Sequence, residues 1–212
     1  RPGGNSGRRM GGWCRRERNG VDDLKGLKMG IPGLGGEGLQ RAGGTPVTLP
    51  GGEIFTALET GAIDATEWLG PYNDMAFGLY KAAKYYYYPG WHEPGTVLEA
   101  MINQKAFEAL PADLQQIVLT CCHAINEQMY AEFMARNNEA LQTLVNEHGV
   151  ILKEFPDAVL KKLRDLSAEV IADGVAKDPL YARVYESYSA FQKRSASYLK
   201  VSEFSYLQAR DL

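Results

Sequence analysis

Three glycines, Gly33, Gly35 and Gly38, have the spacing of a nucleotide-binding turn. Their stretch, GLGGEG, follows an apolar run and opens a helical one, as does the turn that receives a pyrophosphate. Against this function, Pro32 interrupts the junction of strand and loop, and LPGG occupies residues 49–52, where the acid for a ribose is expected. The pattern leaves open a fragment of an NAD(P)-dependent oxidoreductase, but it favours a tight turn with an open helix N-terminus.

A second candidate is the pair Glu67 and Trp68 in the stretch IDATEWLGP. Both residues follow a predicted strand, at the edge of the sheet where ligands bind in α/β folds. The carboxylate could bind a ligand and the indole could form a wall beside it. The alternative is an exposed acid next to a core tryptophan.

The remaining chemical residues form no pattern of a catalytic or zinc site. His92, His123 and His148 have no metal-ligand spacing with one another or with the three cysteines, and neither HExxH nor CxxC occurs. No GxSxG motif is present to mark a nucleophile. We therefore expect no catalytic residues, and we expect that the protein is not an enzyme.

The elements that must position these residues begin with a βαβαβ unit over residues 27–67. Short apolar runs alternate with helical stretches there, and Gly or Pro bounds each of them. The predicted strands are 27–31, 46–49 and 62–66, and the predicted helices are 34–42 and 53–60. Such a unit implies a parallel sheet whose strands end at one edge.

Helices dominate the rest of the predicted chain. We expect one helix over residues 71–84, a strand at YYYYPGWHEPG that runs into a loop, and another strand at 150–155. Three- and four-residue apolar spacing predicts a single helix over 111–147, roughly 55 Å long. Two further helices begin at Pro156 and Pro179, and the second carries an aromatic stripe typical of a core or an interface. The N-terminal segment contains one apolar cluster, residues 10–14, which we expect to be a strand.

Composition sets the broad class. The 212 residues are 45% hydrophobic and 23% charged, which is typical of a soluble globular protein. The 23 basic and 26 acidic side chains give a formal charge of −3, so we expect no binding of nucleic acid, although basic residues are concentrated in residues 1–30. No run of 18 apolar residues occurs, and no initiator Met or leader is present, which fits a mature protein or a fragment.

Four blocks of the sequence resemble, in order, consecutive blocks of the DctP-type receptors of TRAP transporters. The blocks are GNSGRRMGGWCRRE, the long stretch DLKGLKMGIPGLGGEGLQRAGGTPVTLPGGEIFTALETGAIDATEWLGPYND, YYYYPGWHEPG and INQKAFEALPADLQQIV. The resemblance covers nearly the whole chain and is strongest for the branch that binds 2-oxo acids. It is far more specific than any single motif above.

This resemblance implies an α/β periplasmic-binding-protein-like lobe with long C-terminal helices, as a fragment of a two-lobe fold whose N-terminal lobe segment is missing. The implied domains are a strand and linker segment of the ligand cleft (1–26), an α/β lobe (27–110), and helices that cross the lobes and form a homodimer (111–212). The implied function is periplasmic capture of a small 2-oxo or 2-hydroxy carboxylate, such as pyruvate, for sodium-driven uptake through TRAP membrane subunits. A truncated homologue that no longer binds is the alternative.

The resemblance also implies a site without organic cofactors but with a bound Na⁺ or Ca²⁺. Glu67 and Trp68 match its carboxylate and carbonyl ligands. Asn5 falls in a loop that faces the ligand, and Glu93 is a further expected contact. The sequence departs from the family at Arg9, where a glutamine metal ligand is usual, and at Gly30, where the family has an arginine that pairs with the substrate carboxylate.

The residue at position 9 is expected to have opposite effects on the binding of the cation and on the binding of the carboxylate. Arg9 repels a cation and cannot act as its ligand. Its planar guanidinium could instead replace the carboxylate partner that is lost at Gly30. The alternative is that Arg9 points to solvent together with Arg8.

Overall fold

The computed structural model describes residues 1–210 and 212 and separates into two compact units, Arg1–Ser167 and Ala168–Leu212. The first unit carries both sheets. Its strands are β1 (Pro2–Arg8), β2 (Gly12–Cys14), β3 (Lys28–Gly30), β4 (Thr45–Val47), β5 (Ala65–Thr66), β6 (Tyr85–Tyr88), β7 (Gly95–Glu99) and β8 (Ile151–Glu154). Its helices are η1 (Val21–Leu24), α1 (Gly33–Arg41), α2 (Gly51–Thr60), α3 (Pro71–Ala76), α4 (Leu79–Ala82), α5 (Gln104–Glu108), α6 (Ala112–Asn146) and the first turns of α7 (Asp157–Lys177).

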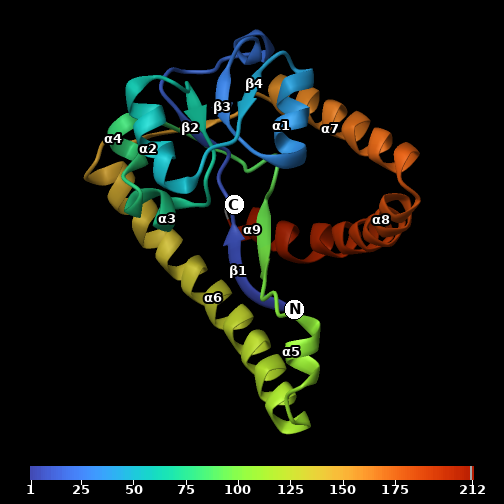
Figure 1. The fold of residues 1–212 in the computed structure, drawn as a ribbon. Helices are drawn as coiled ribbons and strands as arrows, with labels where there is room; N and C mark the ends of the chain where they lie inside the picture. The colour runs from blue at the N-terminus through green and yellow to red at the C-terminus, as the bar shows by residue number, and fades with distance from the viewer. Residues whose placement is uncertain (211) are drawn as a thin grey trace. The chain divides into compact units, whose positions relative to one another are not determined.

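The central sheet has six strands in the order β4-β3-β5-β2-β6-β8 (Figure 1). Strand β3 pairs in parallel with both β4 and β5, which confirms the predicted βαβαβ unit. Strand β2, from the predicted apolar cluster, lies between β5 and β6 and is antiparallel to both. The ends of β3, β5 and β6 and the start of β2 therefore meet at the same edge of the sheet.

Each face of this sheet has its own core, because successive side chains of a strand point to opposite sides. On one face, Cys14 and Tyr87 belong to a buried cluster that includes Leu39 of α1 and Leu163 of α7. On the other face, their neighbours Trp13 and Tyr86 stack at 4.0 Å between ring centroids. This second cluster is completed by side chains of α2, α4 and the end of α6, namely Ile54, Leu58, Leu79 and Leu144.

The prediction of one helix over residues 71–84 is wrong, because the structure divides this segment into α3 and α4. Gly78 lies between them with φ 70°, in the left-handed region that glycine adopts without steric cost. Its N–H donates to the carbonyl of Met75, which closes the first helix. The chain therefore turns at Gly78, although the apolar spacing continues through it.

A two-stranded antiparallel ribbon of β1 and β7 lies below the sheet in Figure 1. The sequence did not predict β1, since PGGNSGR lacks apolar alternation. Helix α6, predicted as one long helix, packs along β1 and α3. Several apolar side chains of β7 and the first half of α6 are exposed, among them Val97, Ile117 and Ile125.

The second unit contains the end of α7, then α8 (Pro179–Leu199), the π-helical turn η2 (Lys200–Phe204) and α9 (Ser205–Arg210). Helix α8 begins where the sequence predicts, and the carboxylate of Asp178 caps its first N–H groups. Its aromatic stripe is exposed, with Tyr188, Phe191 and Tyr198 each more than half accessible. The predicted division into a cleft segment, a lobe and a helical domain stays a prediction. The two units of the structure are defined by compactness, and they do not test those three boundaries.

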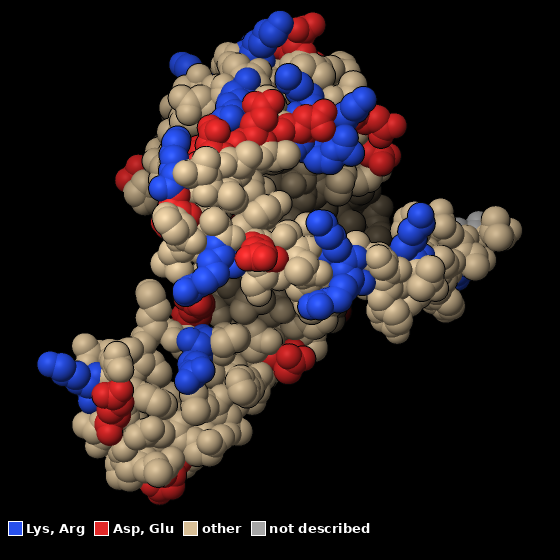
Figure 2. Space-filling view, turned by 90° about the vertical axis from the view of Figure 1, so that its right-hand side faces the viewer, with Lys and Arg blue, Asp and Glu red and all other residues tan. Residues whose placement is uncertain are grey.

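Charged side chains of both signs are interspersed over the upper part of the face drawn in Figure 2. This mixture agrees with the formal charge of −3. Among the described residues, no helix has both the length and the apolar character needed to cross a membrane.

Candidate functional site

Three chain segments meet at the edge where β3, β5 and β6 end. The backbone N–H of Arg9 donates to the carbonyl of Pro94 at 3.1 Å, and that of Met10 donates to Leu69 at 3.3 Å. The N–H of Glu67 donates to Gly30 at 3.0 Å. The first two bonds join residues 9 and 10 to residues 94 and 69, and the third joins Glu67 to the end of β3, so side chains that are distant in sequence converge.

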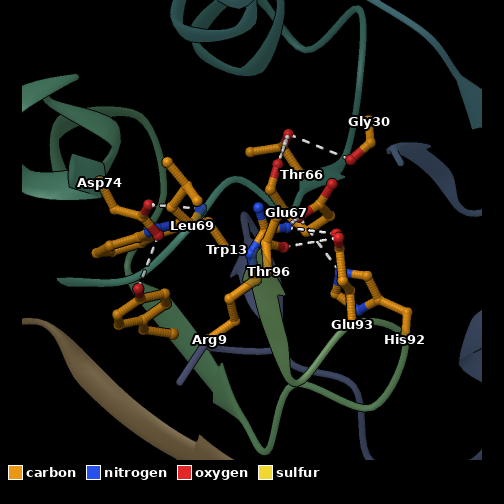
Figure 3. A network of polar contacts seen from close by, with 11 residues as sticks. Arg9, Trp13, Gly30, Thr66, Glu67, Leu69, Asp74, His92, Glu93 and Thr96 are labelled. Atoms are coloured by element: carbon orange, nitrogen blue, oxygen red, sulfur yellow. Dashed lines mark hydrogen bonds and ion pairs between the residues drawn. The ribbon is translucent and has the colours of Figure 1, made fainter. Parts of the chain in front are cut away.

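The converging side chains are Arg9, Glu67, His92 and Glu93, which we call the Arg9 cluster (Figure 3). Nη1 of Arg9 lies 2.5 Å from Oε2 of Glu93 and 3.6 Å from Oε2 of Glu67. Nε2 of His92 lies 3.2 Å from the same oxygen of Glu67. The hydroxyl of Thr96 donates to Oε1 of Glu93 at 2.7 Å and fixes that carboxylate. Arg9 thus points into the protein and not to solvent.

Burial makes this cluster unusual. The side chains of Arg9, Glu67 and His92 are 10%, 8% and 4% exposed. Nε of Arg9 and both ring nitrogens of His92 have no hydrogen-bond partner among the described residues. The 3.2 Å approach of His92 to Glu67 is close enough for an ion pair but lacks hydrogen-bond alignment. An unpaired buried polar group costs about 1–3 kcal/mol, so these donors are suited to an acceptor supplied by a ligand.

The charges of the Arg9 cluster favour binding an anion together with a cation. Arg9 contributes one positive charge and the two glutamates contribute two negative charges. A carboxylate added alone would increase this negative excess in a mostly buried place, which is costly. Glu67 supplies an oxygen ligand suited to Na⁺ or Ca²⁺, whereas Arg9 cannot be a ligand. Among residues 1–210 and 212, no group of three His, Cys, Asp or Glu side chains is placed to hold a metal, so such a cation also needs carbonyl or ligand oxygens.

The other predicted residues lie around this cluster. The indole of Trp68 packs against Phe77, with ring centroids 4.9 Å apart, and its buried Nε1 has no partner among the described residues. Asn5 lies in β1, where its side chain accepts from the N–H of Gly7 at 2.9 Å. It lines an open hollow of about 270 Å³ with Thr96 and Tyr130. The structure therefore brings Arg9, Glu67 and Glu93 together, whereas Asn5 bonds to Gly7 and shares a hollow with Thr96, the partner of Glu93.

Gly30 lies at the end of β3 and its carbonyl accepts from Glu67. A Cβ at this position would lie 2.7 Å from Oγ1 of Thr66 and 3.5 Å from Ile63. The Thr66 hydroxyl lies 3.3 Å from the carbonyl of Gly30 and 3.0 Å from that of Glu67. A larger residue here, such as the arginine that the resemblance implies, must displace this fully buried threonine.

A buried acid, Asp74, anchors the neighbouring loop. It accepts hydrogen bonds from Nε1 of Trp13 at 2.8 Å, from the hydroxyl of Tyr86 at 2.7 Å and from the N–H of Leu69 at 3.0 Å (Figure 3). Burial raises the pKa of Asp74 to about 6, although the three donors oppose this shift. Asp74 thus connects the sheet to the loop that carries Glu67.

His92 is a member of the Arg9 cluster that the sequence does not predict, because it has no metal-ligand spacing with the other histidines or the cysteines. The available signal was its position next to Glu93 in WHEPG, directly after a strand that ends at the ligand edge.

Comparison with known proteins identifies relatives of the whole chain. A curated relative from Nostoc sp. (strain PCC 7120), the monocarboxylate 2-oxoacid-binding periplasmic protein all3028, is 43% identical over 205 residues, which are 97% of this chain and 56% of the relative. A solved TRAP periplasmic solute-binding protein from Colwellia psychrerythraea, with bound calcium and pyruvate, is 41% identical with a TM-score of 0.95 over 99% of this chain and 64% of its own.

Two further solved relatives are similar. One from Pseudoalteromonas atlantica T6c, with bound sodium and pyruvate, is 42% identical with a TM-score of 0.93 over 98% of this chain and 63% of its own. One from Bordetella bronchiseptica RB50, a mixed-occupancy dimer with calcium and picolinate, is 38% identical with a TM-score of 0.93 over 98% of this chain and 61% of its own. The chain thus spans less than two thirds of the length of each of these relatives. Residues 3–178 match the bacterial extracellular solute-binding proteins of family 7. This chain therefore belongs to the DctP family of extracellular solute-binding proteins.

Proposed function

We propose that this protein binds a small 2-oxo or 2-hydroxy monocarboxylate at the Arg9 cluster, as the extracytoplasmic solute-binding subunit of a TRAP transporter. The observation that carries the proposal is the set of buried donors on Arg9 and His92 that find no partner within residues 1–210 and 212. A carboxylate accepts from a guanidinium through short, charge-assisted hydrogen bonds. The family is one of solute-binding proteins, which supports binding of the acid without transformation.

A cation accompanies the acid in this proposal. Two negative charges surround one arginine, and an incoming carboxylate requires compensation. The contacts of Arg9 and His92 to the Glu67 carboxylate are both made to Oε2, so Oε1 is the oxygen we assign to Na⁺ or Ca²⁺, together with the carbonyl of Trp68 that the resemblance implies as a ligand. The relatives solved with calcium and pyruvate, or with sodium and pyruvate, support this pairing.

Arg9 replaces one function that the resemblance implies, the pairing with the substrate carboxylate, and opposes the other, the binding of the cation. Its charge occupies the side of Glu67 where the family's glutamine would assist the cation, and its guanidinium supplies the carboxylate partner that Gly30 does not. We expect weaker cation binding than in relatives with the usual pair. Glu93 holds Arg9 in place through its 2.5 Å contact.

The wider role follows from the family. Delivery of the acid from the periplasm to TRAP membrane subunits is the corresponding physiological function. The exposed aromatic stripe of α8 supports a homodimer, because an isologous contact would bury it twice. The relative from Bordetella bronchiseptica is a dimer.

Calorimetric titration with pyruvate, in calcium, in sodium and in a buffer with neither cation, tests the proposal. We expect saturable binding that strengthens with at least one cation. Absence of heat under all three conditions would instead support a homologue that no longer binds. A parallel titration with NAD and NADP, followed by tryptophan fluorescence, should show no saturable change.

A further inference from the structure

His92 is a buried side chain whose polar atoms are unused. Its side chain is 4% exposed, and its ring packs edge-on against Trp91 with 5.2 Å between centroids. Neither ring nitrogen has a hydrogen-bond partner among the described residues. Neutral imidazole carries one N–H donor and one acceptor, so in either tautomer a donor is left unpaired.

His92 packs against the glycine-rich first turn of α1. A Cβ on Gly35 would lie 3.0 Å from Cβ of His92 and 3.1 Å from Cδ1 of Ile31. A Cβ on Gly38 would lie 3.8 Å from the indole of Trp91. The absence of a side chain at Gly35 thus allows His92 to approach α1 closely. The close approach of His92 accounts for the glycine at position 35 without a nucleotide, whereas a Cβ at position 38 would make only ordinary van der Waals contact.

Because His92 lies beside Glu67, it is also close to Arg9, the residue that we expect to pair with the carboxylate of the ligand. His92 and Arg9 approach the same oxygen of Glu67, at 3.2 Å and 3.6 Å. A 2-oxo acid bears its second polar atom on the carbon adjacent to the carboxylate. An acid that accepts from Arg9 therefore presents its C2 oxygen within the neighbourhood of His92.

We infer that His92 donates a hydrogen bond to the C2 oxygen of the acid and so selects 2-oxo and 2-hydroxy acids over plain carboxylates. The inference rests on the proposed function of the same site. The chemistry matches, because an imidazole N–H can donate to the uncharged C2 oxygen, whereas the charged Arg9 suits the carboxylate. A site built to bond such an oxygen disfavours the analogue that lacks it, since its buried donor then stays unpaired.

The test compares pyruvate with propionate, which lacks the C2 oxygen. Calorimetry of the parent should show at least about tenfold tighter binding of pyruvate. His92→Leu should abolish this preference by weakening pyruvate more than propionate, since only pyruvate offers a C2 oxygen to the lost donor. His92→Gln, which keeps an amide donor, should recover part of the preference.

A second arm moves His92 without altering its chemistry. Gly35→Ala forces a shift at Cβ of His92 and should reduce the preference for pyruvate. Gly52→Ala is the matched control, because its Cβ meets open space near the start of α2, and it should leave the preference unchanged.

Equal weakening of pyruvate and propionate in His92→Leu would show a purely structural role and overturn the inference, with the proposed function intact. An unchanged preference in His92→Leu would overturn it as well. A parent that binds neither acid would contradict the proposed function itself and the inference with it.

Discussion

Arg9 and Glu67 face each other at the ligand edge of the central sheet, with Nη1 of the arginine 3.6 Å from Oε2 of the glutamate. One residue precedes β2 and the other follows β5, and the antiparallel pairing of these strands brings them together. The same carboxylate is thus the partner of an arginine and the only side-chain ligand that we assign to a cation. Arg9 and the cation therefore compete for the charge of the Glu67 carboxylate.

Glu67→Gln should abolish cation-dependent stabilisation of the protein. A cation at a hundredfold excess over its dissociation constant adds about 2.7 kcal/mol to the free energy of unfolding. An uncharged amide loses most of the attraction for Na⁺ or Ca²⁺. Thermal melts with and without each cation measure the effect, and Glu53→Gln on the exposed side of α2 is the control. Identical melts of the parent in all buffers would show that no cation binds and remove this part of the proposal.

Gly30→Arg should destabilise the protein by about 1–3 kcal/mol, because the new Cβ overlaps Oγ1 of Thr66 at 2.7 Å. Thr66→Ala removes that oxygen. In the Gly30→Arg background it should therefore be stabilising, whereas in the parent it costs about 1 kcal/mol for the lost hydroxyl contact. Urea unfolding of the four proteins checks this reversal of sign. If Thr66→Ala is equally destabilising in both backgrounds, the two positions are not coupled.

The predictability of the fold differs between its parts. The βαβαβ unit was predictable because Gly and Pro mark its turns and the apolar spacing changes between strand and helix. The break at Gly78 was hidden, since apolar spacing continues through it and only the left-handed backbone reveals it. Strand β1 was also hidden, because pairing with β7 defines it and its own side chains do not.

The site was predictable only residue by residue. Resemblance named Glu67, Arg9 and Glu93, but their contacts depend on tertiary pairing, and the bond from Arg9 to Glu93 joins residues 84 positions apart. The burial of Arg9 ran against the ordinary exposure of arginine. His92 was missed because its function depends on the space beside Gly35, which sequence spacing does not show.

Asp74 should make stability fall as the pH rises through about 4 to 7. Its pKa is raised from 3.8 to about 6 by burial, so between these values the native state binds more protons than the unfolded state. Its contribution is fully present below pH 4 and is lost as the carboxylate ionises. The stability of the parent relative to Asp74→Asn should thus decrease by about 3 kcal/mol across this range. Urea unfolding at several pH values measures the difference, and a constant difference would contradict the raised pKa.

Helix α8 should mediate a homodimer. Phe191 is 62% exposed on its aromatic stripe, and Phe191→Asp places a charge where an isologous contact would bury it. Light scattering at about tens of micromolar should show a dimer for the parent and a monomer for this variant, given the micromolar or tighter affinity of a standard interface. Ala190→Asp, off the stripe, is the control and should remain dimeric. A monomeric parent at this concentration would refute the interface.

The most direct test of the account is the affinity of Arg9→Met for pyruvate, measured by calorimetry in the presence of calcium. Arg9 supplies the charged donors for the carboxylate, so its loss should weaken binding by about 10- to 100-fold. Arg16→Met removes the same charge from an exposed position and should bind within about twofold of the parent. Binding by Arg9→Met that is as tight as in the parent would show that the acid does not bind at the Arg9 cluster.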